Sequence, residues 1–149
     1  MNGRVVAINI SRYKGVRKGT VETAILRESY GIEGDAHASS EGHRQVSLLS
    51  VESIQRMREL GVDVGPGDFA ENITTDGIDL RRLPVSARIG VGDTVELEVT
   101  QIGKTCHSRC AIYFQAGCCV MPDEGIFARV VRGGTIRIGD GISVRLQGG

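Results

Sequence analysis

The segment Gly103–Cys110 carries the residues of this chain that are best suited to chemistry. It reads Gly-Lys-Thr-Cys-His-Ser-Arg-Cys, so two thiols stand among lysine, histidine and arginine. Neighbouring positive charge lowers the pKa of a cysteine, and the resulting thiolate is both a nucleophile and a soft metal ligand. Cys110, directly after Arg109, is therefore the best candidate for a reactive thiol. Lys104 and His107 are further cationic neighbours, and the whole segment indicates sulfur or metal chemistry.

The remaining cysteines leave alternatives open. Cys118 and Cys119 lie among small apolar residues, a setting typical of buried hydrophobic side chains. A structural zinc site is a second interpretation, formed by this pair with Cys106, His107 and Cys110. The spacing Cys-x3-Cys followed by adjacent cysteines matches no common zinc-finger pattern. Disulfides are not expected, because a chain of 149 residues can bury a core without them.

A second group of polar side chains lies between Gly31 and Gln45. Asp35 follows a glycine, and Gly-Asp pairs are ordinary turn formers, so Asp35 is either a turn residue or a ligand acceptor. His37 and His43 are ligands, phosphate contacts or solvated loop residues, and their spacing fits no helical metal pair. Arg44, beside His43, is the better anion contact because guanidinium is a planar fork that suits phosphate.

Two further stretches are polar: one contains side chains able to do chemistry, and the other is a run of basic residues. The segment Gly65–Asn72 ends in Glu71 and Asn72. Glu71 is expected to be a solvated or turn-stabilising carboxylate rather than a general base. The side-chain amide of Asn72 can both donate and accept hydrogen bonds. The run Arg12–Lys18 contains Arg12, Lys14, Arg17 and Lys18, and such a charge run is usually a solvated turn.

The elements that must position these residues are mainly β. Glycine is the dominant turn former, with 21 copies against 3 prolines, and short β-type runs lie between the glycines. Several of the runs alternate apolar and polar residues, as half-buried strands do. The expected strands are Val5–Ile10, Thr20–Leu26, Gln45–Leu49, Val95–Ile102, Ile126–Val131, Thr135–Ile138 and Ile142–Leu146.

One helix is expected directly after the third of these strands. Ser50 is a good N-cap, and an apolar face follows through Val51, Ile54, Met57 and Leu60. Gly61 then supplies the left-handed residue at which helices end. A shorter helix or turn is expected from Ser108 to Gln115. The sequence therefore predicts a mainly β barrel with one or two short helices.

Composition excludes several classes of protein. Residues 1–149 have the size of a single domain. Basic and acidic residues balance at 18 each and tryptophan is absent, so neither nucleic acid nor a membrane surface is an expected partner. No segment has the roughly 20 apolar residues that span a bilayer, and the N-terminus does not read as a signal peptide. A cytoplasmic protein with reduced cysteines is expected.

Taken together, these segments resemble the MOSC domain family, named for the C-terminal domain of molybdenum cofactor sulfurase. The resemblance covers about Val5 to Val144 and is closest to the small free-standing bacterial members linked with molybdenum cofactor biosynthesis. The motifs that carry it, in order along the chain, are Gly34–His37 with His43–Gln45, Pro66–Thr74 and Ser108–Cys110. The fold that it implies is a MOSC-type β-barrel of complex topology, in agreement with the expected strands.

The resemblance also implies a function for Cys110. In related amidoxime-reducing enzymes a cysteine within Ser-Arg-Cys binds molybdenum, and Cys110 matches that cysteine, with Ser108 and Arg109 as its neighbours. Cys106 stands four residues earlier rather than three, so no role is assigned to it. Those enzymes carry an additional N-terminal β domain that this sequence does not contain. Transfer of the molybdenum cofactor, or of its sulfur, is therefore favoured over catalytic reduction.

In this interpretation Cys110 is a thiolate that ligates molybdenum or accepts sulfur as a persulfide. Arg109, Lys104 and His107 would keep it ionised. The cofactor, molybdopterin bound transiently, is anionic through its phosphate, and Arg44 with His43 would hold that end.

The pterin ring presents an amino group and a ring N–H, which suit acceptors such as Asp35 or Asn72. His37 completes the expected cofactor-binding set. Pyridoxal phosphate is not an expected cofactor. The expected partners are cofactor biosynthesis proteins or a cysteine desulfurase. Two alternatives stay open: a small molybdenum-dependent reductase completed by a partner or by dimerisation, and a zinc-stabilised structural domain.

Overall fold

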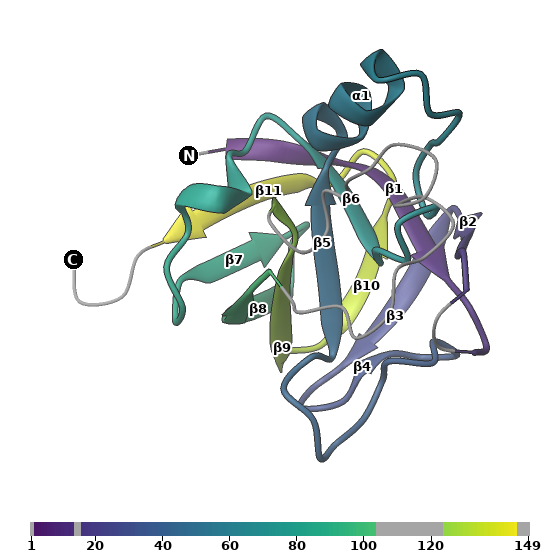
Figure 1. Ribbon diagram of the computed structural model, residues 1–149. Coiled ribbons are helices and arrows are strands. Elements are labelled where there is room, and N and C mark those ends of the chain that lie inside the picture. The colour runs from purple at the N-terminus through teal and green to yellow at the C-terminus, as the bar shows by residue number, and fades with distance from the viewer. Residues whose placement is uncertain (1, 14–15, 104–123, 146–149) are drawn as a thin grey trace.

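The structure is a computed structural model that describes residues 2–13, 16–103 and 124–145, and its architecture is mainly β (Figure 1). Among these residues, one α-helix, α1 (Val51–Glu59), and one short 3-10 helix, η1 (Leu80–Arg82), interrupt the strands. The strands are β1 (Asn2–Ile10), β2 (Gly19–Val21), β3 (Thr23–Arg27), β4 (Gly31–Ile32), β5 (Val46–Ser50), β6 (Ile73–Asp76), β7 (Arg88–Val91), β8 (Val95–Ile102), β9 (Ile126–Arg132), β10 (Gly134–Arg137) and β11 (Gly141–Arg145).

Seven strands close into a barrel. They follow the order β11-β7-β8-β9-β5-β6-β1, and the pairing of β1 with β11 completes the ring. Closure satisfies the backbone groups that an open sheet edge would expose. Strand β2 extends the sheet beyond β1, and β10, β3 and β4 form a separate three-stranded sheet on the side of the barrel away from β7 (Figure 1). The predicted barrel with few helices is confirmed.

Helix α1 exists because two neighbouring barrel strands are parallel. Strands β5 and β6 pair in parallel, and such strands need a crossover connection, which α1 begins directly after β5 (Figure 1). The Ser50 side chain accepts a hydrogen bond from the Ser53 N–H and caps the helix. Gly61, with φ +89°, follows its last turn in the left-handed conformation. The predicted start and end of this helix are confirmed.

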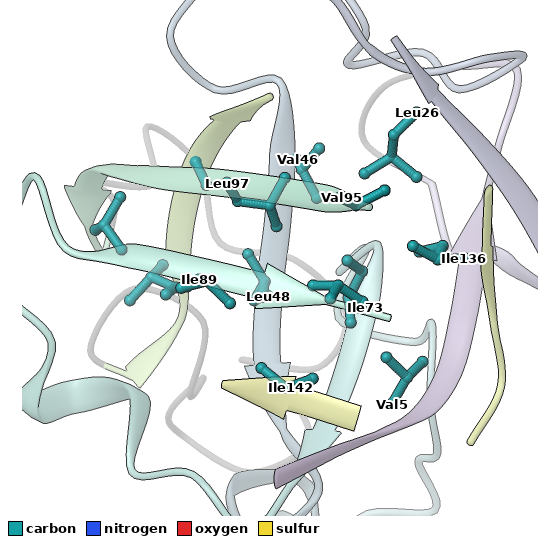
Figure 2. Packing of buried hydrophobic residues seen from close by; sticks show 14 of the residues in the cluster. Val5, Leu26, Val46, Leu48, Ile73, Ile89, Val95, Leu97, Ile136 and Ile142 are labelled. Atoms are coloured by element: carbon teal, nitrogen blue, oxygen red, sulfur yellow. The ribbon is translucent and has the colours of Figure 1, made fainter. Parts of the chain in front are cut away.

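Two apolar clusters lie on opposite faces of the barrel wall. Inward-facing residues from the barrel strands and from β3 and β10 fill the interior, where Leu48, Ile73 and Leu97 converge (Figure 2). On the outside, Leu49 and Phe127 pack with residues of α1 and of the chain that follows it. Consecutive residues of a strand point to opposite faces, so Leu48 and Leu49 belong to different clusters.

Most of the predicted strands are present, with some differences. The run Thr20–Leu26 forms two strands, because β2 pairs with β1 whereas β3 pairs with β10. Strands β4, β6 and β7 were not expected. The short helix expected at 108–115 lies outside the described residues. None of the helices described is both long and apolar enough to cross a membrane.

Candidate functional site

The barrel brings together the residues that flank positions 104–123, which contain all four cysteines and are called the cysteine segment below. Strand β8 ends where β9 begins, with Ile102 opposite Ile126, and the Gly103 N–H donates to the Gly125 carbonyl over 2.7 Å. The chain therefore leaves the barrel for this segment and returns to it at adjacent points. The predicted residues of the segment itself lie outside the described residues; they are Lys104, Cys106, His107, Arg109, Cys110, Cys118 and Cys119.

Gln101, near the end of β8, gathers the predicted anion-binding residues beside this exit. Its side-chain oxygen accepts a hydrogen bond from Arg44 Nε over 2.9 Å and lies 2.7 Å from His43 Nε2. Since the oxygen can only accept, the proton of the His43 contact lies on Nε2. The Gln101 amide nitrogen in turn donates to the Gly103 carbonyl over 2.8 Å. Gln101 thus joins His43 and Arg44 to the point where the cysteine segment departs.

The Arg44 guanidinium also has an aromatic support. Its central carbon lies 5.2 Å from the centroid of the Phe127 ring, within the range of a cation–π contact. Phe127 is itself packed in the outer apolar cluster beside α1, so its ring is a fixed surface. Arg44 is exposed and donates to Gln101 through Nε, and among the described residues its two terminal nitrogens make no hydrogen bond, so they can face an anion. This geometry fits a phosphate group.

A second group of polar residues is buried where the chain between β1 and β2 meets the loop after β4. The ammonium of Lys18 lies 2.7 Å from Asp35 Oδ1, and neither side chain is exposed to solvent. Lys18 Nζ also lies 3.0 Å from Ser11 Oγ and 3.1 Å from His37 Nδ1. Asp35 accepts further hydrogen bonds from the backbone N–H groups of Ser11 and His37. We call these four residues the Lys18 network.

The Asp35 carboxylate is ionised in spite of its burial. Burial by itself would raise the pKa of Asp35, but the contacts with His37 and Lys18, together with the positive charge of Lys18, outweigh it. They hold the pKa of Asp35 well below its ordinary value. Asp35 is thus a turn residue, as its bond to the His37 N–H shows, and also the counter-ion of a buried lysine.

A third polar group lies on β1, β5 and β6 and on the chain just before β6. Asn9 Nδ2 donates to the Glu71 carbonyl and to Thr74 Oγ1. The Asn72 amide donates to the Asn9 carbonyl over 3.1 Å and accepts from both the backbone and the hydroxyl of Ser47. All of these side chains except that of Ser47 are completely buried. We call these five residues the Asn9 network.

Glu71 is the one ionisable group of the Asn9 network. Its Oε2 accepts from the Gly67 N–H over 3.0 Å and from the Thr74 hydroxyl over 2.7 Å, whereas Oε1 has no partner among the described residues. Burial raises the pKa of Glu71, and the bonds from Thr74 and Gly67 offset this only in part. The carboxylate stabilises the turn at Gly67, as expected, but the prediction that it could be solvated is wrong.

Gly67 connects the two buried networks. Its carbonyl accepts a hydrogen bond from the Lys18 N–H and its own N–H donates to Glu71. Gly67 has φ +87°, and a Cβ placed on it would lie 2.3 Å from the Lys18 carbonyl oxygen. Real atoms do not approach so closely, so only glycine fits here.

A comparison with protein families identifies the family of this chain. The model of the MOSC domain family matches residues 33–143, which include Asp35 and His37 of the Lys18 network, all of the Asn9 network except Asn9, and strands β8 and β9. This chain belongs to the MOSC domain family. No curated protein matches its sequence.

Solved structures share the fold of this MOSC domain. The YuaD protein from Bacillus subtilis has a TM-score of 0.81 at 19% identity, over 97% of this chain and 96% of that one. YiiM from Geobacillus stearothermophilus has a TM-score of 0.71 at 18% identity, over 98% of this chain and 76% of its own. YiiM from Escherichia coli has a TM-score of 0.69 at 18% identity, with 99% and 71% covered. At this identity the likeness concerns the fold.

The structure divides the predicted binding residues of the MOSC domain into three places. His43 and Arg44 meet at Gln101, Asp35 and His37 belong to the Lys18 network, and Asn72 belongs to the Asn9 network. Cofactor binding by any of them stays a prediction. For Asn72 it would require breaking the buried hydrogen bonds described above.

Sequence reasoning missed two residues of this arrangement. Lys18 was expected in a solvated turn, which is wrong, because its side chain is buried against Asp35. Gln101 carried no signal beyond its place two residues before Gly103. Within residues 2–13, 16–103 and 124–145, no three histidine, cysteine or acidic side chains are grouped so that they could hold a metal ion.

Proposed function

We propose that this MOSC domain binds the molybdenum cofactor, or the sulfur destined for it, and passes it on through Cys110. The MOSC family is associated with domains of the molybdenum cofactor sulfurase type. The observation that carries the proposal is the junction at Gln101, which joins His43 and Arg44 to Gly103, the last described residue before the cysteine segment. The predicted anion-binding residues thus lie at the end of β8 from which the chain continues toward Cys110.

Each residue has a defined task in this proposal. Arg44 would hold the phosphate of the cofactor with its two terminal nitrogens, and Gln101 and Phe127 would keep the guanidinium plane in place. The bound cofactor would supply the molybdenum atom and the ligands around it. Arg109, Lys104 and His107 would favour the thiolate of Cys110.

Sulfur transfer needs no outside oxidant if the donor is a persulfide. The Cys110 thiolate attacks the terminal sulfur of a persulfide on a donor protein such as a cysteine desulfurase. The bond between the two sulfurs of the donor breaks, its cysteine leaves as a thiolate, and Cys110 becomes the persulfide. A cytoplasmic location and partners from cofactor biosynthesis are part of the same proposal, because reduced thiols persist there.

Substitution of Cys110 tests the thiol. We expect Cys110→Ser to abolish labelled-sulfur uptake from a persulfide-loaded cysteine desulfurase and to lower cofactor binding at least tenfold. Cys118→Ser and Cys119→Ser are the matched controls and should retain both. Full sulfur and cofactor uptake by Cys110→Ser would overturn the proposal.

A second arm of the same experiment tests the anion contact. Charge-assisted hydrogen bonds are worth about 1.5–3 kcal/mol, so Arg44→Ala should weaken cofactor binding by roughly 10- to 100-fold. Gln101→Leu should weaken it less, because it frees the guanidinium without removing it. Arg27→Ala removes another exposed arginine, on β3, and should have no effect. Equal losses for Arg27→Ala and Arg44→Ala would mean that Arg44 contributes only general positive charge.

A further inference from the structure

Lys18 has its hydrogen-bonding capacity fully used inside the protein. An ammonium group has three N–H donors. The structure supplies three acceptors: Asp35 Oδ1 at 2.7 Å, Ser11 Oγ at 3.0 Å and His37 Nδ1 at 3.1 Å. Because the Lys18 side chain is not exposed, water cannot replace any of them. A buried ammonium that lost one of these bonds would leave a donor unsatisfied, at a cost that proteins avoid.

This arrangement fixes the state of the His37 ring. A histidine nitrogen can accept a hydrogen bond only if it carries no proton. The other neighbour of Nδ1 is Asp35 Oδ2 at 3.6 Å, too far for a hydrogen bond, whereas the Lys18 contact is within range. We infer that Lys18 is a positioning residue, which holds His37 as the neutral tautomer with its proton on Nε2.

Both partners of this contact are held in place from the backbone. The Lys18 N–H donates to the Gly67 carbonyl, and the His37 N–H donates to Asp35 Oδ2. The Ser11 hydroxyl accepts from Lys18 and donates to the Tyr13 carbonyl, so it cannot turn away. The direction of the Lys18–His37 contact is therefore set by the fold.

The tautomer determines what His37 can bind. Its side chain is 23% exposed, and since Nδ1 faces buried Lys18, the accessible edge of the ring is the one that carries Nε2. That edge offers an N–H donor and no lone pair. Its ligand is therefore an acceptor oxygen, on an anion or a carbonyl, and not a metal ion. The tautomer and the class of ligand do not depend on the proposed function. The proposed function is needed only to identify this ligand as part of the molybdenum cofactor.

Nitrogen chemical shifts of the imidazole ring test the tautomer in the ligand-free full chain. Long-range proton–nitrogen correlation at about pH 8, above the ordinary imidazole pKa of about 6.5, reports which ring nitrogen is protonated. His37→Gln assigns the signal among the three histidines. We expect a protonated Nε2 and an unprotonated Nδ1. A protonated Nδ1, which would donate to Asp35, would overturn the inference.

Variants of the network separate positioning from folding. The double variant Lys18→Met/Asp35→Asn removes both buried charges, so no unpaired ion is left inside the protein. In this variant the nitrogen chemical shifts of His37 should move toward those of a mixture of tautomers. Ser11→Ala removes a different acceptor of Lys18 and should leave the His37 signals unchanged. Wild-type nitrogen shifts in the double variant would show that Lys18 does not set the tautomer.

Two probes test the ligand class. Inorganic phosphate should displace the His37 Nε2–H signal of the wild-type protein, whereas zinc ions should not bind at Nε2. Zinc coordination there, or phosphate saturation without any change at His37, would overturn the assignment of an oxygen ligand. Cys110→Ser should give the wild-type result in every one of these measurements, so failure here and failure of the proposed function are distinguishable.

Discussion

Asp35 and Glu71 are both buried carboxylates that stabilise turns, but their surroundings drive them in opposite directions. Asp35 has an ammonium 2.7 Å away and two backbone donors, and the pKa of Asp35 is held well below its ordinary value. Glu71 accepts from neutral donors such as those of Thr74 and Gly67, and burial raises the pKa of Glu71. Burial disfavours the charged form at both sites, so the difference comes from the contacts of Asp35 with His37 and with the Lys18 cation, which Glu71 lacks among the described residues.

This comparison shows where the barrel keeps a fixed charge and where it does not. The Lys18 network holds an ion pair that can orient His37, a side chain that reaches the surface. The Asn9 network consists of amides and hydroxyls around Glu71, and its buried hydrogen bonds join β1, β5 and the start of β6. The Lys18 network is suited to presenting a hydrogen-bond donor to a ligand, whereas the Asn9 network holds the strands together.

Removing the cation should have the largest effect. Lys18→Met leaves the buried Asp35 carboxylate unpaired, and breaking a buried ion pair in this way costs about 3–5 kcal/mol of unfolding free energy. Urea unfolding followed by circular dichroism measures it, because the chain has no tryptophan. The depressed pKa of Asp35 stabilises the wild type above about pH 4, and this contribution is lost as the pH falls further. The difference in unfolding free energy between the wild type and Lys18→Met should therefore narrow in acid.

The double variant Lys18→Met/Asp35→Asn is the control for that prediction. It removes the unpaired charge and should recover a large part of the lost stability. A single Lys18→Met variant as stable as the wild type at pH 7 would mean that Asp35 does not depend on this cation.

Substitution at the junction of the two networks should have the next largest effect. Gly67→Ala forces a positive φ on alanine and sets its Cβ against the Lys18 carbonyl oxygen. Gly61→Ala is the matched control, because Gly61 has φ +89° but open space around its Cβ position. We expect a loss of about 1 kcal/mol for Gly61→Ala and at least about 2 kcal/mol more for Gly67→Ala. Equal losses would show that the junction can adjust.

Local sequence patterns predicted much of the barrel. The bounds of β8 are those expected, and residues 95–100 alternate apolar and polar side chains. Helix α1 was found from its cap and its glycine stop. Strands β6 and β7 were missed because they are short, and β6 is buried along most of its length, so neither presents a long alternating pattern.

The candidate site was less accessible to sequence reasoning, because its contacts are made by tertiary structure. Lys18 belongs to a run of basic residues, and nothing local distinguishes the one that is buried against Asp35, seventeen positions away. Gln101 reaches His43 and Arg44 across a separation of more than fifty residues. The motif residues Asp35 and His37 were found, but their partner was not.

The smallest predicted effect concerns Glu71 and has the opposite dependence on pH. Because the pKa of Glu71 is raised in the folded protein, the folded state binds more protons than the unfolded state above about pH 4.3, and stability falls as the pH rises. Glu71→Gln keeps an oxygen for Gly67 and Thr74 but cannot ionise, so its stability relative to the wild type should improve steadily between pH 4 and pH 7. Urea unfolding at several pH values measures the trend. A variant whose stability relative to the wild type instead falls as the pH rises would mean that Glu71 has a cationic partner, as Asp35 does, and the two carboxylates would then no longer be opposites.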